Sequence, residues 1–231
     1  MKKSKIIAGA LVACLAVGAG ATMAACKEDK NIYVTNATEL VTAVEEAKAG
    51  DKIVLKNDIV VDSPVEFDKK LTLDLNGKKI SNTDDIWNEE AGDWALISVR
   101  ADGELTITGN GTVEAKENDC YAADVQEGGK LIIKDSKFVG NISSVYVHTG
   151  ELVVDGGTFE INQLSEHGDY RYVLNCFDAS YEAEIAKITV NGGTFENFNP
   201  DNNLSEGAET DYLAEGYTAA LVEGYYVVSK A

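Results

Sequence analysis

The 231-residue sequence has few of the residues that mark several common protein classes. Its only arginines are Arg100 and Arg171, and 39 acidic residues against 20 lysines and arginines give a formal net charge of −19. A surface this acidic repels polyanions, so nucleic acid is set aside as a partner. Two prolines are too few for a proline-rich disordered chain. The two histidines, His148 and His167, are isolated in the sequence and therefore offer no zinc site.

Long apolar runs are absent after the N-terminus. A basic start and an apolar, small-residue segment over 6–21 are typical of a signal peptide, which we place at 1–25. It ends in Thr-Met-Ala-Ala-Cys26, which resembles a bacterial lipobox; this implies that Cys26 is acylated and becomes the mature N-terminus. Met23 stands where lipoproteins usually have leucine, so ordinary cleavage and secretion is the alternative.

One short phrase is repeated in the rest of the chain. It consists of an apolar–X–apolar triplet, a turn of Asn, Asp, Ser or Gly, and then a β-branched or aromatic residue. The copies begin at Leu71, Leu105, Leu131, Leu152 and Ile188, in steps of 21 to 36 residues. The period of two within each triplet predicts a strand, and the irregular spacing predicts a solenoid whose coils carry loops of variable length.

Stacked coils would bring equivalent residues into three interior ladders, since one coil cannot bury its own apolar face. The first ladder contains Leu71, Leu105, Leu131, Leu152 and Ile188; the second contains Leu73, Ile107, Ile133, Val154 and Val190; the third contains Ile80, Val113, Phe138, Phe159 and Phe195. An antiparallel sandwich of short strands is the alternative. A sandwich gives no reason to repeat Gly-Gly-Thr-Phe in register, which favours the solenoid.

This register also bears on the two cysteines that remain after Cys26. Cys120 and Cys176 would lie about two coils apart, roughly 9–10 Å at the spacing of β-strands. That separation exceeds the ~7 Å between Cα atoms that a disulfide spans. We therefore expect two separate thiols.

The solenoid needs a cap at each open end. At the N-terminal end, Asn36 with Glu39 three residues later indicates a capping box. The helix it begins would place Leu40, Val41, Val44 and Ala47 on one face and end at Gly50. At the other end, Glu223-Gly224 between two apolar runs predicts a β-hairpin cap. The domain organisation is then a signal peptide over 1–25, a tether over 26–34 and one β domain over 35–231.

The helix followed by Gly50-Asp-Lys-Ile-Val-Leu, the Leu71-Thr-Leu-Asp-Leu-Asn-Gly phrase and the Gly-Gly-Thr-Phe coils resemble the pectate-lyase-like superfamily, which has the pectin-lyase fold. The resemblance implies an all-β, single-stranded right-handed parallel β-helix. The C-terminal part, including Tyr212-Leu-Ala-Glu-Gly-Tyr, is similar to small β-helix modules of gut-bacterial surface proteins and phage fibre proteins. The fold hosts both enzymes and inert fibres, so it does not assign an activity.

Enzymes of this superfamily need residues that the sequence does not supply together. Asn82-Thr83-Asp84 matches the first motif of polygalacturonase-like hydrolases. That family's paired aspartates and its Gly-His-Gly and Arg-Ile-Lys motifs are missing. Glu166-His167-Gly168 matches the Gly-His-Gly motif only poorly. No arginine follows an acidic cluster as a pectate lyase requires. We expect a protein without a catalytic site, with a glycoside hydrolase or polysaccharide lyase as the alternative.

The candidate binding residues lie in two insertions. The first, 82–94, holds both tryptophans of the chain, Trp87 and Trp94, and a set of carboxylates: Asp84, Asp85, Glu89, Glu90 and Asp93. The second, 163–172, adds Tyr170 and Arg171. Both insertions could project from one flank and bound a groove. The tryptophans pack within their loop or form a stacking platform.

These residues predict an acidic, surface-anchored module with a structural or adhesive role. Its partner would be a neutral glycan or a protein surface, and it would contact the membrane through the lipid on Cys26. No cofactor is expected; a structural Ca²⁺ on the 82–94 carboxylates is the weaker alternative, because their spacing is not that of an EF-hand. The oligomeric state stays open, and a phage-fibre-like trimeric spike is a further alternative. The location expected is extracytoplasmic, at the bacterial cell envelope.

Overall fold

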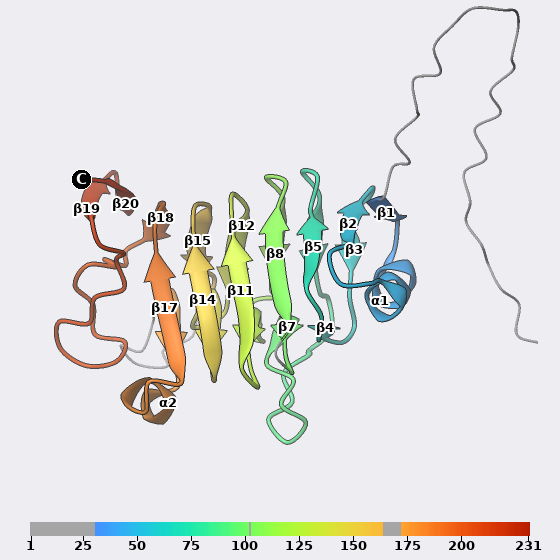
Figure 1. The fold of residues 1–231 in the computed structure, drawn as a ribbon, viewed down its shortest axis with the longest axis horizontal. Helices are drawn as coiled ribbons and strands as arrows, with labels where there is room; N and C mark the ends of the chain where they lie inside the picture. Colours follow the sequence, from blue (N-terminus) through green and yellow to red (C-terminus); the bar gives the residue numbers. More distant parts are fainter. Residues whose placement is uncertain (1–30, 102, 164–171) are drawn as a thin grey trace, which may run out of the picture.

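The computed structural model describes residues 31–101, 103–163 and 172–231. These residues form an all-β fold of three sheets whose strands stand side by side along the long axis of the molecule (Figure 1). Two short helices, α1 (Ala37–Glu46) and α2 (Asp178–Glu182), accompany the sheets. Cys26, His167, Tyr170 and Arg171 lie outside the described residues.

The first sheet has seven parallel strands. In spatial order they are β1 (Asn31–Val34), β2 (Lys52–Leu55), β5 (Leu71–Asp74), β8 (Glu104–Thr108), β11 (Gly129–Ile133), β14 (Gly150–Val154) and β17 (Ala186–Val190). Leu131 pairs with Leu105 and Leu152, and Ile133 pairs with Ile107 and Val154. The remaining pairs continue both rows from β5 to β17, so the first two predicted ladders are confirmed.

The second sheet has eight strands and carries the third ladder. In spatial order they are β19 (Tyr217–Val222), β20 (Tyr225–Lys230), β18 (Gly193–Glu196), β15 (Thr158–Ile161), β12 (Lys137–Gly140), β9 (Thr112–Glu114), β6 (Lys79–Ser81) and β3 (Ile59–Val60). The register pairs the third-ladder residues from Ile80 to Phe195 as predicted. The ring of Phe159 stacks on Phe138 at 5.7 Å and on Phe195 at 5.0 Å between centroids.

The third sheet has five parallel strands. They are β16 (Leu174–Cys176), β13 (Val145–Val147), β10 (Tyr121–Val125), β7 (Ala95–Val99) and β4 (Val65–Phe67). From β2 to β18 the chain visits the first, second and third sheets in turn, three strands to a circuit, and every pairing among these strands is parallel. The ladder residues fill the space between the sheets and are at most 5% exposed.

The glycines of the repeated Gly-Gly-Thr-Phe phrase allow the circuits to turn closely on one another. Gly157 and Gly193 have φ of +106° and +112°, in the region that side chains disfavour. A Cβ on Gly157 would also lie 2.3 Å from the carbonyl oxygen of Ser136 in the preceding circuit. The repeat of glycine therefore follows from the stacking distance as well as from the turn.

Helix α1 lies over the N-terminal end of the sheets (Figure 1). The Asn36 side chain caps it by accepting a hydrogen bond from the Glu39 N–H, as predicted, but the Glu39 carboxylate accepts from the Thr35 N–H and hydroxyl instead of from Asn36. The buried face is formed by Leu40, Ala43 and Val44. The prediction for Val41 is wrong: it lies one residue beyond Leu40, about 100° around the helix, and is 38% exposed. The helix ends at Glu46, before Gly50.

Residues 31–34 of the expected tether form β1, which pairs with β2. At the C-terminal end, β19 and β20 form the predicted antiparallel hairpin around Glu223 and Gly224, both with positive φ. The hairpin extends the second sheet by pairing with β18. The buried rings of Phe198 and Tyr212, from the segment 197–216, cover the end of the core beside it.

Cys120 and Cys176 are buried free thiols. Cys120 immediately precedes β10, whereas Cys176 ends β16, and β13 lies between these two strands. The two residues therefore differ in position both across and along the sheet. Burial raises the pKa of both thiols well above the usual range, so both are poor nucleophiles.

Candidate functional site

The connections from the second sheet to the third carry most of the extra residues. The insertion 82–94 joins β6 to β7, and the segment 162–173 joins β15 to β16. Both therefore begin and end at the same two sheets, along the edge where the second and third sheets meet. In Figure 1 the strand β7, which follows the first insertion, is labelled in the lower half of the ribbon. No part of 164–171 is among the described residues.

Asp119 holds the start of the 82–94 insertion. Its carboxylate accepts hydrogen bonds from the backbone N–H groups of Ile86 and Trp87, each 3.0 Å from Oδ1, and from the Asn82 amide, 2.6 Å from Oδ2. Asn82 is buried and also accepts from the Lys116 N–H at 2.7 Å. The Asn82 side chain thus has a structural role, and the backbone of Trp87 is fixed to the next circuit of the chain.

A second contact holds the end of the insertion. The carbonyl oxygen of Gly92 accepts from the Arg100 guanidinium at 2.7 Å and from the Gln126 amide at 3.1 Å. Asn88 and Asp93 pair as a short antiparallel bridge within the insertion. Arg100 also forms an ion pair with Glu66 at 3.1 Å. Hydrogen bonds therefore hold the insertion near both of its ends and position the aromatic residues that it carries.

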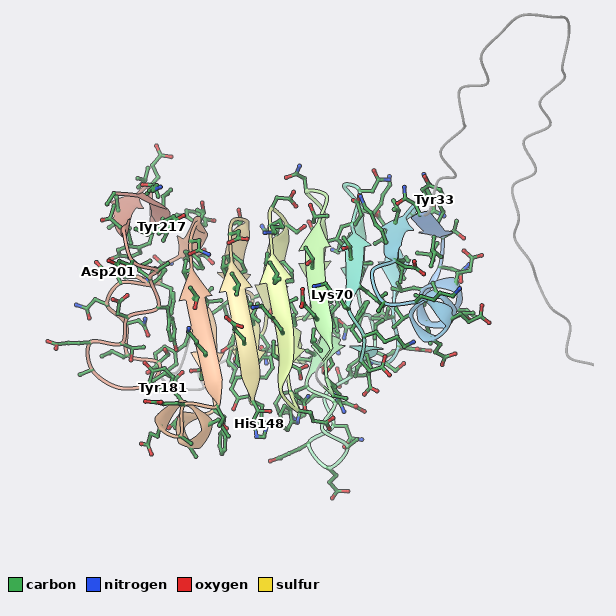
Figure 2. All side chains as sticks on the ribbon, in the orientation of Figure 1. Tyr33, Lys70, His148, Tyr181, Asp201 and Tyr217 are labelled. Atoms are coloured by element: carbon green, nitrogen blue, oxygen red, sulfur yellow. The ribbon has the colours of Figure 1, made fainter. Side chains whose placement is uncertain are left out.

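Six rings form a continuous series of contacts on the outer side of the third sheet; we call them the aromatic row. They are Trp87, Trp94, Tyr121, Tyr146, His148 and Phe177. Trp87 stacks on Trp94 with centroids 6.5 Å apart, and Trp94 in turn meets His148 at 5.2 Å. His148 lies at the lower ends of the strands (Figure 2). Trp87, which contacts both Trp94 and Tyr121, and Phe177, which contacts His148, are each 42% exposed.

A cleft of about 550 Å³ opens beside Trp87. It is lined by Asp85, Trp87, Asn118, Asp119, Tyr121, Asn141, Ile142 and Gln163. The buried Oδ1 of Asn141 has no hydrogen-bond partner. A cavity of about 580 Å³ near α1 has charges of both signs but no aromatic ring in its lining. The cleft is therefore the better candidate site, since it combines a stacking surface with amide groups.

Asp124 is buried beneath this surface. It lies on β10 with 0% exposure, and its Oδ2 accepts from the Gln126 amide at 2.7 Å, while Oδ1 has no partner. Burial raises the pKa of Asp124 to about 6. The hydrogen bonds of Ser98 and Gln126 and the charge of Arg100 act in the opposite direction and lower this pKa, but by less than burial raises it. The carboxyl is thus linked through Gln126 to the same Gly92 carbonyl that anchors the insertion.

The predicted site residues are only partly brought together. Trp87 and Trp94 are in contact, with Trp87 exposed and Trp94 half-buried as its support. Asp85 lines the cleft and forms an ion pair with Lys116, whereas Asp84 is exposed and is not among the lining residues. Tyr170 and Arg171 lie outside the described residues.

The sequence reasoning missed several residues of the site: Asn118, Asp119, Tyr121, Asp124, Asn141, Tyr146 and Phe177. They come from three successive circuits, with Asn118, Asp119, Tyr121 and Asp124 in the first of them, and they share no motif. The one local signal was an aspartate, Asp124, inside the otherwise apolar run Tyr121–Val125.

Within the described ranges, no helix is long and apolar enough to cross a membrane. Over the same residues, no group of three or more histidine, cysteine, aspartate and glutamate side chains is placed to hold a metal ion. Comparison with protein-family models, curated proteins and solved structures finds no match for this chain.

Proposed function

We propose that the protein is a non-enzymatic glycan-binding module of the bacterial cell surface, built as a right-handed parallel β-helix and anchored by a lipid on Cys26. Its ligand is a glycan without acidic groups. The observation that carries this proposal is the exposed Trp87 ring beside the 550 Å³ cleft, supported from behind by Trp94. Sugars present apolar ring faces to aromatic side chains and hydroxyls to amides, and the cleft offers both.

The right-handed winding is supported by the topology. Successive parallel strands follow one another through three sheets and return to the first sheet beside the previous strand. Connections of this kind are right-handed in about 98% of proteins, because right-handed strand twist favours that path. The sequence resemblance to the pectate-lyase-like superfamily agrees with this winding.

The carboxylates of the cleft favour binding over hydrolysis. A glycoside hydrolase needs two carboxyl groups free to act on the substrate as acid and as base or nucleophile. Both Asp119 oxygens accept hydrogen bonds that hold the insertion, and Asp85 is paired with Lys116. The net charge of −19 repels uronates and other acidic sugars, which restricts the ligand to neutral or basic glycans.

Replacing Trp87 tests the binding site directly. Trp87→Ala is expected to weaken glycan binding about tenfold or more, because the stacking surface and its burial are both lost. Glycans would be selected on an array with the mature wild-type protein, and affinities measured by titration calorimetry. Tyr33→Ala is the matched control, since Tyr33 is an aromatic residue 45% exposed on β1, at the N-terminal end of the molecule (Figure 2), and is not among the residues that line the cleft. Equal loss in both variants, or no loss in Trp87→Ala, contradicts the site.

The anchor is tested separately. In the native host, Cys26→Ser is expected to move the protein from the membrane fraction to the medium, because the acylated thiol is removed while the cleavage region is otherwise kept. Cell fractionation with immunoblotting measures this. Cys120→Ser, which changes a buried thiol of the domain, should leave the protein with the membrane. Retention of the Cys26→Ser protein would show that the chain is held by other means.

A further inference from the structure

The second sheet ends in a free edge at the C-terminal end of the molecule (Figure 1). Within the described residues, β19 pairs with β20 on one side and with no strand on the other. Its six residues, Tyr217-Thr-Ala-Ala-Leu-Val222, contain no charge and no proline, and their pairing with β20 runs without a bulge. Proteins usually protect an edge strand by one of these features, so an unprotected edge marks a surface to which another strand adds.

The hairpin geometry shows which backbone groups of β19 face this edge. The two-residue turn has positive φ at both positions, +51° and +87°, as in a type I′ turn. The residues that flank the turn therefore exchange hydrogen bonds, and so does every second residue back along β19. Tyr217, Ala219 and Leu221 direct their N–H and C=O groups outward instead. The Tyr217 N–H donates to the Ala214 carbonyl at 3.1 Å. The outward groups of Ala219 and Leu221 have no partner in the described part of the chain.

These outward groups define a register in which β19 pairs with a second copy of itself. An antiparallel pair with its two-fold axis at Ala219 places the two Ala219 residues opposite each other, and Tyr217 opposite Leu221 of the second copy. Both kinds of pair then form hydrogen bonds that the edge leaves open. The Leu221 side chain, 61% exposed in one chain, lies against the Tyr217 ring of the other in this arrangement.

The charges of the chain favour this pairing over other contacts between copies. The net charge of −19 opposes most of them, whereas β19 is uncharged, and the register brings only Glu215 of one copy opposite Glu223 of the other. At the far end of the same sheet, β3 is two residues long and lies between Asp58 and Asp62. Head-to-tail pairing of β19 with β3 would form few hydrogen bonds beside two carboxylates, so a closed two-fold pair is favoured over an open chain.

We propose that the protein forms a homodimer in which β19 pairs antiparallel with β19 of a second copy, so that the second sheets of both chains become one continuous sheet. The two α1 helices then lie at opposite ends of the dimer (Figure 1). The cleft beside Trp87 is formed by other segments, between residues 85 and 163. The dimer therefore carries two clefts and, under the proposed function, binds a repeated glycan with avidity.

Cysteine cross-linking tests the register in the mature protein carrying Cys26→Ser. Ala219→Cys places two thiols opposite each other with Cα atoms about 5.5 Å apart, within the range that a disulfide spans. Ala220→Cys is the matched control. Ala220 is the more exposed of the two alanines, but the pairing sets its two copies about 8–9 Å apart, beyond that range. Oxidation with copper phenanthroline should give a covalent dimer of Ala219→Cys and little of Ala220→Cys on non-reducing electrophoresis. Equal amounts from both variants, or none from Ala219→Cys, would contradict the register.

Sedimentation equilibrium measures the dimer itself. An interface of one strand pair is small, so we expect a dissociation constant on the order of 10–100 μM. Leu221→Lys should raise it about tenfold or more, because a lysine on an edge strand opposes pairing. Leu204→Lys is the matched control and should leave it unchanged, since Leu204 is 63% exposed in the same C-terminal part but lies outside β19. A wild-type protein that stays monomeric well above this range, or a dimer that Leu221→Lys does not weaken, would overturn the homodimer and leave the glycan-binding proposal untouched.

Discussion

The substitution Ile133→Asp is expected to unfold the protein at neutral pH. Ile133 is 0% exposed on β11, the fifth of seven strands in the first sheet, and it pairs with Ile107 on one side and Val154 on the other. An aspartate there would have to bury an unpaired charge or take up a proton, and it would lose the apolar contacts of the isoleucine. The cost is several kcal/mol, comparable with the total stability of about 5–15 kcal/mol of most domains.

Ile132→Asp is the matched control for this experiment. Ile132 is the preceding residue on the same strand, but its side chain points to the opposite face and is partly exposed. Its replacement should lower the free energy of unfolding by no more than about 1–2 kcal/mol and leave the far-ultraviolet spectrum of a β protein. Chemical denaturation followed by circular dichroism measures both variants. A cooperative, wild-type-like transition for Ile133→Asp would contradict the ladder assignment.

The ladders could be predicted because each circuit repeats the same chemistry at the same place. The triplet that begins at Leu131 and the Phe138 that follows its turn supply one residue to each ladder, and the glycines between strands mark where the chain must turn. The local helix signal at Asn36 was likewise sufficient for the cap. These features depend on neighbouring residues in the sequence, so the sequence contains them in full.

The third sheet could not be predicted in the same way. Its strands share no phrase, and in β7 and β10 all five residues are buried. The 82–94 insertion is fastened over the outer side of these strands through Gly92, so the polar–apolar alternation that marks a strand with one exposed face is missing. A fully buried run of five residues does not by itself show which face is the interior.

The candidate site was predictable only where its residues are close in sequence. Trp87 and Trp94 lie in the same insertion, so the sequence indicates both as candidate binding residues. Asp119, which fixes the backbone of Trp87, is 32 residues away in the next circuit, and Asn141 comes from the circuit after that. Asp119 and Asn141 reach the site because circuits of different lengths stack on one another. No local sequence pattern shows which loop residues of neighbouring circuits will come into contact.

The other large effect expected is on the pH dependence of stability, through Asp124. Its pKa in the folded protein is about 6, raised from 3.8 chiefly by burial. The folded state therefore binds this proton more tightly than the unfolded state does. The stabilising contribution of the protonated group is complete below about pH 3.8, declines as the pH rises towards 6 and is absent above it. At neutral pH the protein carries the cost of a buried carboxylate with one oxygen unpaired.

Asp124→Asn should remove this titration. The asparagine keeps the shape of the side chain and an oxygen that accepts from Gln126, but it carries no charge. Relative to wild type, the variant should gain up to about 3 kcal/mol in free energy of unfolding between pH 4 and pH 7, the free-energy equivalent of the shift in pKa. The gain at pH 7 is reduced if the new amide N–H group finds no acceptor, so the change across the pH range is the diagnostic quantity.

Urea denaturation of both proteins at half-unit steps from pH 4 to pH 7.5 provides the measurement, and Asp201→Asn is the control for an exposed aspartate. The contributions of the carboxylates that all three proteins share cancel in the comparison. The control curve should run parallel to that of wild type, while the Asp124→Asn curve diverges from it between about pH 4 and pH 6. Parallel curves for wild type and Asp124→Asn would mean that Asp124 has an ordinary pKa and reaches water. The 82–94 insertion would then cover the third sheet less closely than its contacts with Arg100 and Gln126 imply.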